Sequence, residues 1–460
     1  MVRLKHPRLV LFSFLMASSF VFSQTKQEIE EIRKTNNITK LKIIEDKTKE
    51  QKTNAKKQAL EMAQTKGWPI TYTENGSFYE LMSITNDNQP IYYKTHNQNA
   101  SISTRANYLN IGGGLGLELD GQGMKAYVWD GGWAHTTHQE FDGPGGEDRV
   151  TIGDEENQTS DHATHVTGTI LASGVNPEAK GMAPQATAVS YRWNNDVPEV
   201  SAAAAEGMLL SNHSYGYGAS GIPDAWFGAY LEDARDFDQI MYNAPYYLMV
   251  VSCGNDGGDS TSNADPIDGN NQYDKLSGMS TSKNNISVAN GQDAQIDADG
   301  NLVSMNRNNG SSEGPTDDFR IKPEIIGNGT GLISSVGDSN GYGNYTGTSM
   351  SGPNVMGSLL LLQQHYNNVN GSFMRASTLK GLALHTADDI TTENSSAPTQ
   401  ALLGPDATTG WGLMNTKKAA EAIDSNGFNS LIMEEVLNEG ETFTISVRSD
   451  DVNSLLASIS

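Results

Sequence analysis

The stretch Tyr345-Thr-Gly-Thr-Ser-Met-Ser-Gly-Pro-Asn354 is the most specific segment of the sequence, because it runs directly into the apolar run Val355-Met-Gly-Ser-Leu-Leu-Leu-Leu362. The pattern predicts a helix that begins at Ser349, since proline is tolerated in a first helical turn. A serine there is expected to have an exposed hydroxyl, a free backbone N–H and the positive end of the helix dipole nearby. Those features suit a nucleophile, but they also suit an ordinary helix cap. Ser349 must therefore be judged together with the rest of the chain.

Two more segments place an acid and a base ahead of this serine. Met124-Lys-Ala-Tyr-Val-Trp-Asp-Gly-Gly132 predicts a buried strand that ends at Asp130, at the edge of the sheet where open α/β folds place their sites. Asp161-His-Ala-Thr-His-Val-Thr-Gly-Thr169 places His162 at the start of a helix of small residues. An aspartate after a strand often only forms a turn. The chain order Asp130, His162, Ser349 nevertheless matches one of the orders in which a Ser-His-Asp triad occurs.

These three segments, taken in register, resemble the subtilase family, and the resemblance extends over roughly Asp120 to Asp424. It implies a serine endopeptidase that hydrolyses peptide bonds through an acyl-enzyme, with protein or peptide substrates and no cofactor required for the chemistry. Asp130, His162 and Ser349 would then form the catalytic triad.

The resemblance also assigns residues to the oxyanion and to the substrate. Val250-Val-Ser-Cys-Gly-Asn-Asp-Gly257 is similar to the family segment that supplies the oxyanion asparagine, which falls on Asn255, although asparagine after a strand is also a common turn residue. Ser211-Asn-His-Ser-Tyr-Gly216 is similar to the segment that lines the primary pocket. The substrate-binding residues that the resemblance implies are Ser214, Tyr215, Gly216 and Asp256. A substrate added as a strand is read mainly through its backbone, so we expect broad specificity, with Asp256 favouring a basic or polar residue before the cut.

A few positions depart from the usual family pattern. Ala163 stands where the family usually has glycine, Ser351-Gly352 replaces a more typical Ala-Ser or Ala-Thr pair, and Asn354 stands where histidine is common. None of these residues is expected to touch a reacting atom. The departures therefore bear on loop geometry and efficiency more than on the reaction.

Two features of the sequence raise the question of metal binding. By resemblance, Glu140 lies near the place where the family often has a calcium-binding carboxylate, so a structural calcium is one expectation there and a plain surface acid is the other. Independently, four histidines lie close together along the chain. They are His135, His138, His162 and His165. The last pair has i,i+3 spacing instead of the i,i+4 of a zinc helix, with no acid between, so a metal-dependent hydrolase is the weaker alternative.

The middle of the chain predicts the fold class. From about Gly121 to Asp424, short apolar strands alternate with longer helical stretches, which is typical of an α/β fold with a mostly parallel central sheet and helices on both faces. The expected strands are Lys125–Trp129, Ala188–Trp193, Met208–Asn212, Tyr246–Ser252, Ile286–Asn290 and Glu324–Ile326. The expected helices are His162–Ser173, Val200–Met208, Ala225–Asn243, Ser349–Tyr366, Met374–His385 and Thr416–Ile423.

Both ends of the chain differ from this core. Residues 24–105 predict a small α+β region, with a charged helix from about Lys26 to Lys66 followed by strands around an Asn-Gly turn. By resemblance this region is a propeptide that assists folding and inhibits the enzyme, and a permanent accessory domain is the alternative. We place the catalytic domain at residues 106–428. Residues 429–460 are expected to start a truncated β-rich domain, because Glu441-Thr-Phe-Thr-Ile-Ser-Val447 alternates.

The first 23 residues have the order of a secretory signal peptide. Arg3, Lys5 and Arg8 precede an apolar run that is too short to favour a membrane span. We therefore expect export, no transmembrane anchor and a location outside the cell or on its surface. Cys253 is the only cysteine, so no intrachain disulfide can form.

The charge of the chain is distributed unevenly. The formal net charge is -24, yet residues 24–100 hold 12 Lys+Arg and 10 Asp+Glu, a net +2, whereas residues 101–460 hold 16 and 45, a net -29. Nucleic-acid binding requires clustered lysine and arginine to neutralise phosphates, so the composition argues against a nucleic-acid partner.

A non-catalytic adhesion or binding protein built on a subtilase scaffold is the alternative to an enzyme. All four expected catalytic positions hold the required residue types, which favours the enzyme.

Overall fold

The computed structural model describes residues 24–459 except for positions 75–76, 86, 95–99, 144–145, 156, 268, 270–272, 392–394, 396–403 and 448–455. The predicted signal peptide, residues 1–23, lies outside the described residues. Within the described ranges, no helix combines the length and the apolar character that a membrane span requires.

A seven-stranded sheet forms the centre of the molecule, with the order β13-β10-β9-β7-β4-β6-β5. All of its strand pairs are parallel. The strands are β4 (Lys125–Asp130), β5 (Val150–Ile152), β6 (Thr187–Arg192), β7 (Leu210–His213), β9 (Leu248–Ser252), β10 (Ile286–Gly291) and β13 (Ile325–Asn328). This confirms the predicted fold class. The edge strand β5 was not predicted, because it has only three residues and two of them are exposed.

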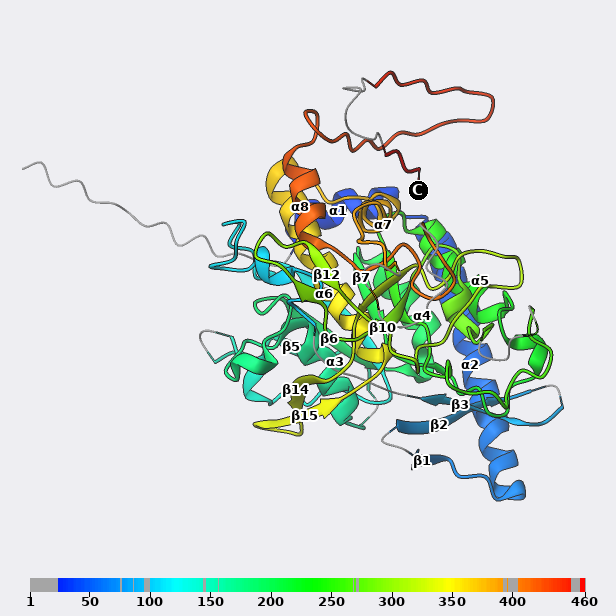
Figure 1. Cartoon of the computed structure of the whole chain (residues 1–460). Coiled ribbons are helices and arrows are strands. Elements are labelled where there is room, and N and C mark those ends of the chain that lie inside the picture. The colour runs from blue at the N-terminus through cyan, green and yellow to red at the C-terminus, as the bar shows by residue number, and fades with distance from the viewer. Residues whose placement is uncertain are drawn as a thin grey trace, which may run out of the picture.

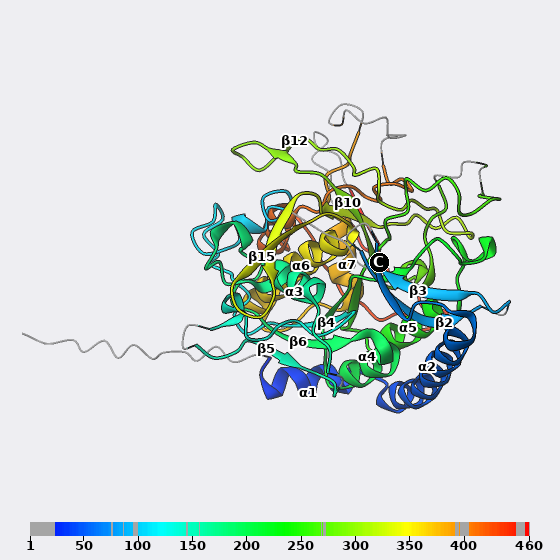
Figure 2. The same ribbon diagram turned by 90° about the horizontal axis from the view of Figure 1, so that it is seen from below.

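Helices cover both faces of this sheet (Figures 1 and 2). One face packs against α3 (Asp161–Leu171) and the long α6 (Thr348–Asn370), which in turn contacts α7 (Ala376–His385) and α8 (Thr416–Asp424). The other face packs against α4 (Asp196–Ala205) and α5 (Glu232–Asn243).

The side chains of β4 explain why both faces are covered, because they alternate between two apolar cores. Ala126 and Val128 are buried with α3 and α6, whereas Trp129 is buried with α4 and α5. A strand with apolar residues on both faces is the pattern of a doubly covered parallel sheet.

Two of the predicted helices have clearly different bounds, and a glycine with positive φ accounts for one end of each; α4 also begins at Asp196, before the expected Val200. The expected helix Ala225–Asn243 is interrupted at Gly228, where φ is 67°, so that α5 begins only at Glu232. The helix expected at Val200–Met208 ends at Ala205, just before Gly207 with φ of 93°. These left-handed conformations end a helix and favour glycine.

A hairpin of β14 (Leu332–Val336) and β15 (Gly341–Tyr345) lies against α3. A Cβ atom at Gly168 would lie 2.2 Å from the Ser335 Oγ, so only glycine allows this close approach. The Ser334 hydroxyl donates to the His165 carbonyl at 2.9 Å. The small residues after His162 therefore hold the helix firmly against the hairpin. Two short strands, β11 (Gln295–Ile296) and β12 (Leu302–Ser304), form a further small sheet.

The N-terminal region has two helices and a three-stranded meander. The elements are α1 (Lys26–Thr35), α2 (Ile38–Lys66), β1 (Thr71–Glu74), β2 (Ser77–Ile84) and β3 (Pro90–Lys94). The meander was predicted, but the helix expected from Lys26 to Lys66 is broken at Asn36 and Asn37. The Asn37 side chain accepts a hydrogen bond from the Lys40 N–H and so caps α2. Figure 2 shows α1 and α2 on the outer side of α4.

Strand β3 joins this region to the central domain. It pairs antiparallel with β8 (Gly216–Tyr217), with Lys94 opposite Gly216 and Tyr93 opposite Tyr217. The Gly218 N–H extends the pairing by donating to the Tyr92 carbonyl at 2.9 Å. The meander and β8 therefore form one four-stranded sheet.

Residues 100–105 lie with the central domain, although we placed them in the N-terminal region. The Asn354 amide of α6 donates to the Ala100 carbonyl at 3.1 Å and to the Thr104 hydroxyl at 3.0 Å. Arg105 is fully buried and is paired with Asp388. The central domain therefore includes residues 100–105, which lie before the predicted domain boundary.

The described residues beyond Ser430 form no strand in this structure. Phe443, Ile445 and Val447 alternate along the chain and are all exposed. The β-rich domain expected over residues 429–460 stays a prediction.

Candidate active site

The predicted acid and the predicted oxyanion and substrate residues follow the carboxyl ends of neighbouring strands. Asp130 ends β4, Ser214 follows β7, and Asn255 follows β9, and these three strands are adjacent in the sheet. The carboxyl ends of parallel strands meet at one edge, which is where open α/β sheets place their sites.

Asp130 and His162 form a buried pair at this edge. His162 Nδ1 lies 2.8 Å from both carboxylate oxygens of Asp130, whose side chain is fully buried. The Gly131 N–H also donates to Asp130 at 2.7 Å. An aspartate that accepts at Nδ1 requires the proton on that nitrogen, so Nε2 becomes the nitrogen that can take up a proton from a nucleophile.

Ser349 lies in the first turn of α6, directly after its first residue Thr348, and exchanges hydrogen bonds with Ser214. Its hydroxyl donates to the Ser214 carbonyl at 2.7 Å, and the Ser214 hydroxyl donates to the Ser349 carbonyl at 2.6 Å. The position at the helix start was predicted, but the hydroxyl was expected to be exposed, whereas Ser349 is 1% exposed. The reciprocal bonds hold the serine against the segment predicted to bind substrate.

Asn255 lies at the same helix start, through contacts with the residue before Ser349. Its Nδ2 donates to the Thr348 hydroxyl at 2.7 Å, and its Oδ1 accepts from the Thr348 N–H at 2.8 Å. Asn255 therefore caps α6 and places its amide group at the residue directly before Ser349. The Ser349 N–H is one of the first-turn groups that have no intrahelical acceptor. The Asn255 amide and the Ser349 N–H therefore both lie at the first turn of α6.

The other predicted substrate residues have distinct places. Gly216 lies in β8, where its backbone is paired with β3. Tyr215 is buried instead of lining an open surface. Asp256 is half-buried, and its N–H donates to the Ser312 hydroxyl at 3.0 Å. An influence of Asp256 on specificity stays a prediction.

A buried hydrogen-bonded chain behind the substrate segment was not predicted. His213 Nδ1 lies 2.9 Å from the Tyr215 hydroxyl and its Nε2 lies 2.9 Å from the Ser211 hydroxyl, which also contacts the Tyr247 hydroxyl at 2.6 Å. Tyr215 donates to Asp196 at 2.9 Å. Burial lowers the pKa of His213 to about 3, so the ring is neutral and donates from Nδ1 to Tyr215. The signal was present as hydrogen-bonding side chains at alternate positions 211, 213 and 215, the first two in β7 and the third just after it.

The remaining histidines do not converge on a metal. His138 accepts from the Glu140 N–H through Nδ1 and contacts the Gly341 carbonyl through Nε2 at 2.8 Å. His165 stacks on Tyr345, and burial lowers its pKa to about 3. Among the residues that the structure describes, no group of three or more His, Cys, Asp or Glu side chains could hold a metal ion. The geometry gives no support to the metal-dependent hydrolase.

Glu140 is bound by protein donors on both oxygens. Its carboxylate accepts from the backbone N–H groups of residues 174–176 at 2.7 to 3.1 Å. The hydroxyls of Ser173 and Tyr342 donate to it at 3.1 and 2.7 Å. A calcium ion needs oxygen ligands around it, whereas these neighbours present N–H and O–H groups toward the carboxylate. The residues around Glu140 therefore do not fit the calcium site that the resemblance implied.

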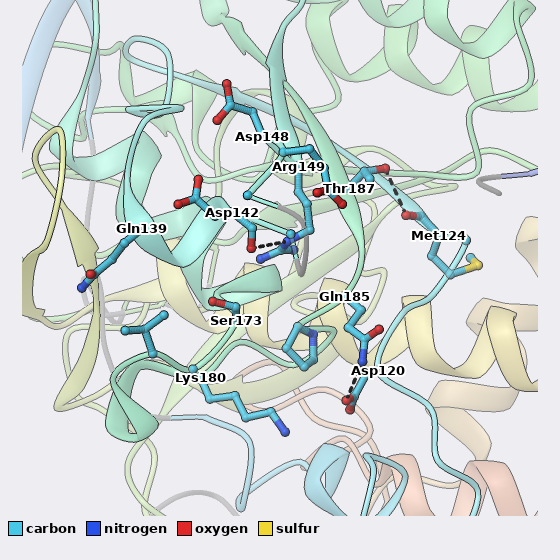
Figure 3. A pocket seen from close by; sticks show the side chains of 17 residues that line it. Asp120, Met124, Gln139, Asp142, Asp148, Arg149, Ser173, Lys180, Gln185 and Thr187 are labelled. Carbon is cyan, nitrogen blue, oxygen red and sulfur yellow. Dashed lines mark hydrogen bonds between the residues drawn. The ribbon is translucent and has the colours of Figure 1, made fainter. Parts of the chain in front are cut away.

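A large pocket lies apart from these residues. Its volume is about 880 Å³, and Asp120, Asp142, Asp148 and Lys180 are among the residues that line it (Figure 3). The Arg149 guanidinium donates to the Asp142 carbonyl at its wall (Figure 3). None of Asp130, His162, Ser349 and Asn255 lines this pocket.

Comparison with known proteins identifies relatives of this chain. A model described as the subtilase family, peptidase family S8, matches residues 131–412, directly after Asp130 and over more than half of the chain. A PI-type proteinase of Lactococcus lactis subsp. cremoris is 29% identical over 160 residues, which is 32% of this chain and 8% of that protein. A PII-type proteinase of Lacticaseibacillus paracasei is 30% identical over 151 residues, 30% of this chain and again 8% of the relative.

Among solved structures, the patellamide maturation protease PatA is similar, with a TM-score of 0.49, 18% identity and coverage of 66% of this chain and 97% of that one. The prenylagaramide maturation protease PagA is also similar, with a TM-score of 0.48, 18% identity and coverage of 66% and 94%. Because the family model spans nearly all of the central-sheet domain and more than half of the residues, the chain belongs to the subtilase family.

Proposed function

We propose that this chain is a serine endopeptidase in which Ser349 is the nucleophile, His162 the general base and acid, and Asp130 the residue that orients His162. The observation that carries the proposal is the buried pair of Asp130 and His162, 2.8 Å apart, at the sheet edge that also holds Ser214 and Asn255. Membership in the subtilase family supports it. Protein or peptide substrates follow from the same family membership.

The first step starts with the Ser349 hydroxyl, which in this structure donates to Ser214. The hydroxyl turns toward His162 Nε2, gives up its proton and attacks the carbonyl carbon of the scissile bond. The oxyanion of the tetrahedral intermediate accepts hydrogen bonds from the Asn255 amide and the Ser349 N–H. These donors stabilise the negative charge that develops on this oxygen as the transition state is reached.

Collapse of this intermediate breaks the bond to the leaving nitrogen, which receives the proton from His162. The acyl group stays on Ser349 Oγ. A water molecule then attacks the ester and gives a proton to His162, which passes it to Ser349 Oγ as the acyl–oxygen bond breaks and the acid is released. Asp130 orients His162 and stabilises the imidazolium.

The N-terminal region acts in this proposal as a propeptide that blocks the site. The support is the pairing of β3 with β8, which uses the backbone edge that an extended substrate would occupy. Charge supports it too, since residues 24–100 carry a net +2 and residues 101–460 a net -29. Because Ala100 and Thr104 are bound to α6, the cut that releases this region lies between Lys94 and Ala100.

Export completes the proposal. Residues 1–23 have the order of a signal peptide, and the catalytic chemistry needs no reducing compartment. The location outside the cell or on its surface rests on this segment. It is tested by N-terminal sequencing of protein recovered from the medium and from the cell surface.

A fluorophosphonate probe tests the function directly, because it labels an activated serine and not an ordinary helix cap. The chain freed of its N-terminal region should incorporate one label on Ser349, and His162→Ala should lose it. A non-catalytic binding protein would remain unlabelled. A metal-dependent hydrolase would remain unlabelled too, but would cleave peptides in a manner that EDTA abolishes.

A further inference from the structure

A lysine of the N-terminal region is bound by two carboxylates of the catalytic domain. Lys52 Nζ, on α2, lies 3.3 Å from Asp196 Oδ1 and 3.5 Å from Asp233 Oδ1. Asp196 begins α4 and is fully buried, whereas the Asp233 side chain on α5 is 22% exposed. We call Asp196 and Asp233 the cation seat. The seat holds an ammonium group that belongs to the region proposed to be removed.

Both carboxylates of the cation seat accept hydrogen bonds from tyrosines in or next to the segment predicted to bind substrate, residues 214–216. The Tyr215 hydroxyl donates to Asp196 at 2.9 Å, and the Tyr217 hydroxyl donates to Asp233. Tyr217 lies in β8, the strand that pairs with β3. A cavity of about 160 Å³ beside the seat is lined by Lys52, Asp233 and Tyr217, among other residues. The seat therefore lies beside the strand along which a substrate would bind.

Removal of the N-terminal region takes the Lys52 ammonium away from Asp196. Burial raises the pKa of Asp196, and the positive charge of Lys52 opposes that rise. A nearby cation therefore lowers the free energy of keeping this carboxylate ionised. Breaking a buried ion pair by removing one partner is strongly unfavourable, because the other charge stays uncompensated. A different cation at the same place restores the balance.

The direction of β3 shows which part of a substrate would reach the seat. Along β3, Tyr93 is opposite Tyr217 and the next residue, Lys94, is opposite Gly216, so the chain runs from Tyr217 toward Ser214 and Ser349. A substrate that runs in the same direction places residues on the N-terminal side of the cut near Tyr217.

We propose that Asp196 and Asp233 form a specificity subsite of the mature enzyme, which binds a lysine or arginine side chain of the substrate several residues before the cut. The inference rests on the proposed function, since it needs a removable N-terminal region and a substrate along β8. Lys52 shows the chemistry of the ligand by placing an ammonium group there.

The chain itself offers one competitor for the seat. Arg192 is bound in this structure to Glu80 of the N-terminal region, and it loses that carboxylate in the same step. If Arg192 turned to Asp196, the seat would be filled from within. A basic preference in the substrate is therefore the observation that separates the two outcomes.

The test uses the mature enzyme and peptides in which each position before the cut carries either lysine or norleucine, which has a similar length and no charge. At one position that is not adjacent to the cut, lysine should raise kcat/KM about tenfold over norleucine. Asp233→Asn should reduce that ratio to about threefold or less. Asp196→Asn should do the same, and the more exposed Asp233 keeps the test valid if the buried variant does not fold.

Glu206→Gln is the matched control. Glu206 lies at the other end of α4 and also pairs with a cation of the N-terminal region, Arg33, at 2.9 Å. Its ratio and its rates should equal those of the wild type. Equal rates for lysine and norleucine at every position, or a ratio that Asp233→Asn leaves unchanged, would overturn the subsite. If no peptide were cleaved, the proposed function would fail, and the subsite would be judged from the Kd values of the same peptides on the same domain.

Discussion

Ser214 and Ser349 exchange two hydrogen bonds, in which each hydroxyl donates to the carbonyl of the other residue, at 2.6 and 2.7 Å. Ser214 follows β7 of the central sheet and Ser349 is the second residue of α6, so the exchange holds the start of α6 against the segment after β7. In the proposed mechanism, the hydroxyl that the Ser214 carbonyl holds is the one that turns to His162. The proposed substrate binding beside Ser214 and the proposed activation of Ser349 would then be linked through this pair of residues.

Asn255 is expected to act in the transition state as well as in capping. Asn255→Ala should lower kcat about a hundred- to a thousandfold, roughly 2.7–4 kcal/mol, the range for loss of one oxyanion donor, with KM nearly unchanged. Because Oδ1 caps the Thr348 N–H, stability should also fall by about 1 kcal/mol. Asn255→Asp is the matched control, since it keeps the capping oxygen but loses the amide donor. A kcat within about tenfold of wild type for Asn255→Asp would remove the oxyanion assignment.

Asp256 is expected to influence the residue directly before the cut. It is half-buried and follows Asn255, so its carboxylate should favour lysine over phenylalanine there by no more than about 1 kcal/mol. Comparing kcat/KM of wild type and Asp256→Asn on a Lys and a Phe substrate measures this. An unchanged ratio would show that Asp256 is an ordinary surface charge. Its effect differs in position from that of Asp233, which acts further from the cut.

Acid should destabilise the fold through its buried neutral histidines. Burial lowers the pKa of His213 and of His165 from 6.5 to about 3. Between these values the unfolded chain binds a proton that the folded chain does not, so stability falls as pH falls, by about 1.4 kcal/mol per unit for each histidine, and levels off below about pH 3. Urea unfolding of Ser349→Ala between about pH 7 and pH 5 measures the slope, and self-digestion is avoided. Adding His213→Gln should make the slope shallower, and an identical slope would contradict the assignment of His213.

Glu140 should stabilise the loop after α3 without a metal. Its carboxylate accepts three backbone N–H groups of residues 174–176, so Glu140→Gln should lower stability by about 1–3 kcal/mol by weakening charge-assisted bonds. EDTA should leave the melting temperature of the wild type unchanged, because no metal is needed at Glu140. A melting temperature that falls with EDTA in the wild type but not in Glu140→Gln would show that a cation is bound there.

The sequence predicted the parts of the site that rest on local patterns. A strand that ends at Asp130, a helix of small residues that begins at His162 and an apolar helix after Ser349 each depend on neighbouring residues, and the strand order brings their ends together. The chain order then implied their catalytic roles by resemblance, and those roles stay a prediction.

Contacts between residues far apart in the chain could not be predicted from local sequence patterns. Nothing near Tyr215 indicates that its hydroxyl donates to Asp196, and nothing near Asn354 indicates that it binds residues 100 and 104. The exposure of Ser349 was predicted wrongly for the same reason, because its partner Ser214 is 135 residues away. Burial of polar groups depends on which segments the fold brings together.

The activity and processing of Ser349→Ala, in a host that lacks other proteases, show whether Ser349 is the nucleophile. We expect no detectable peptide hydrolysis, an unchanged fold by circular dichroism, and retention of residues 24–94, whereas the wild type gains a new N-terminus between Lys94 and Ala100. Ser349→Ala that still cleaves peptides, or that loses the N-terminal region as the wild type does, would contradict this expectation.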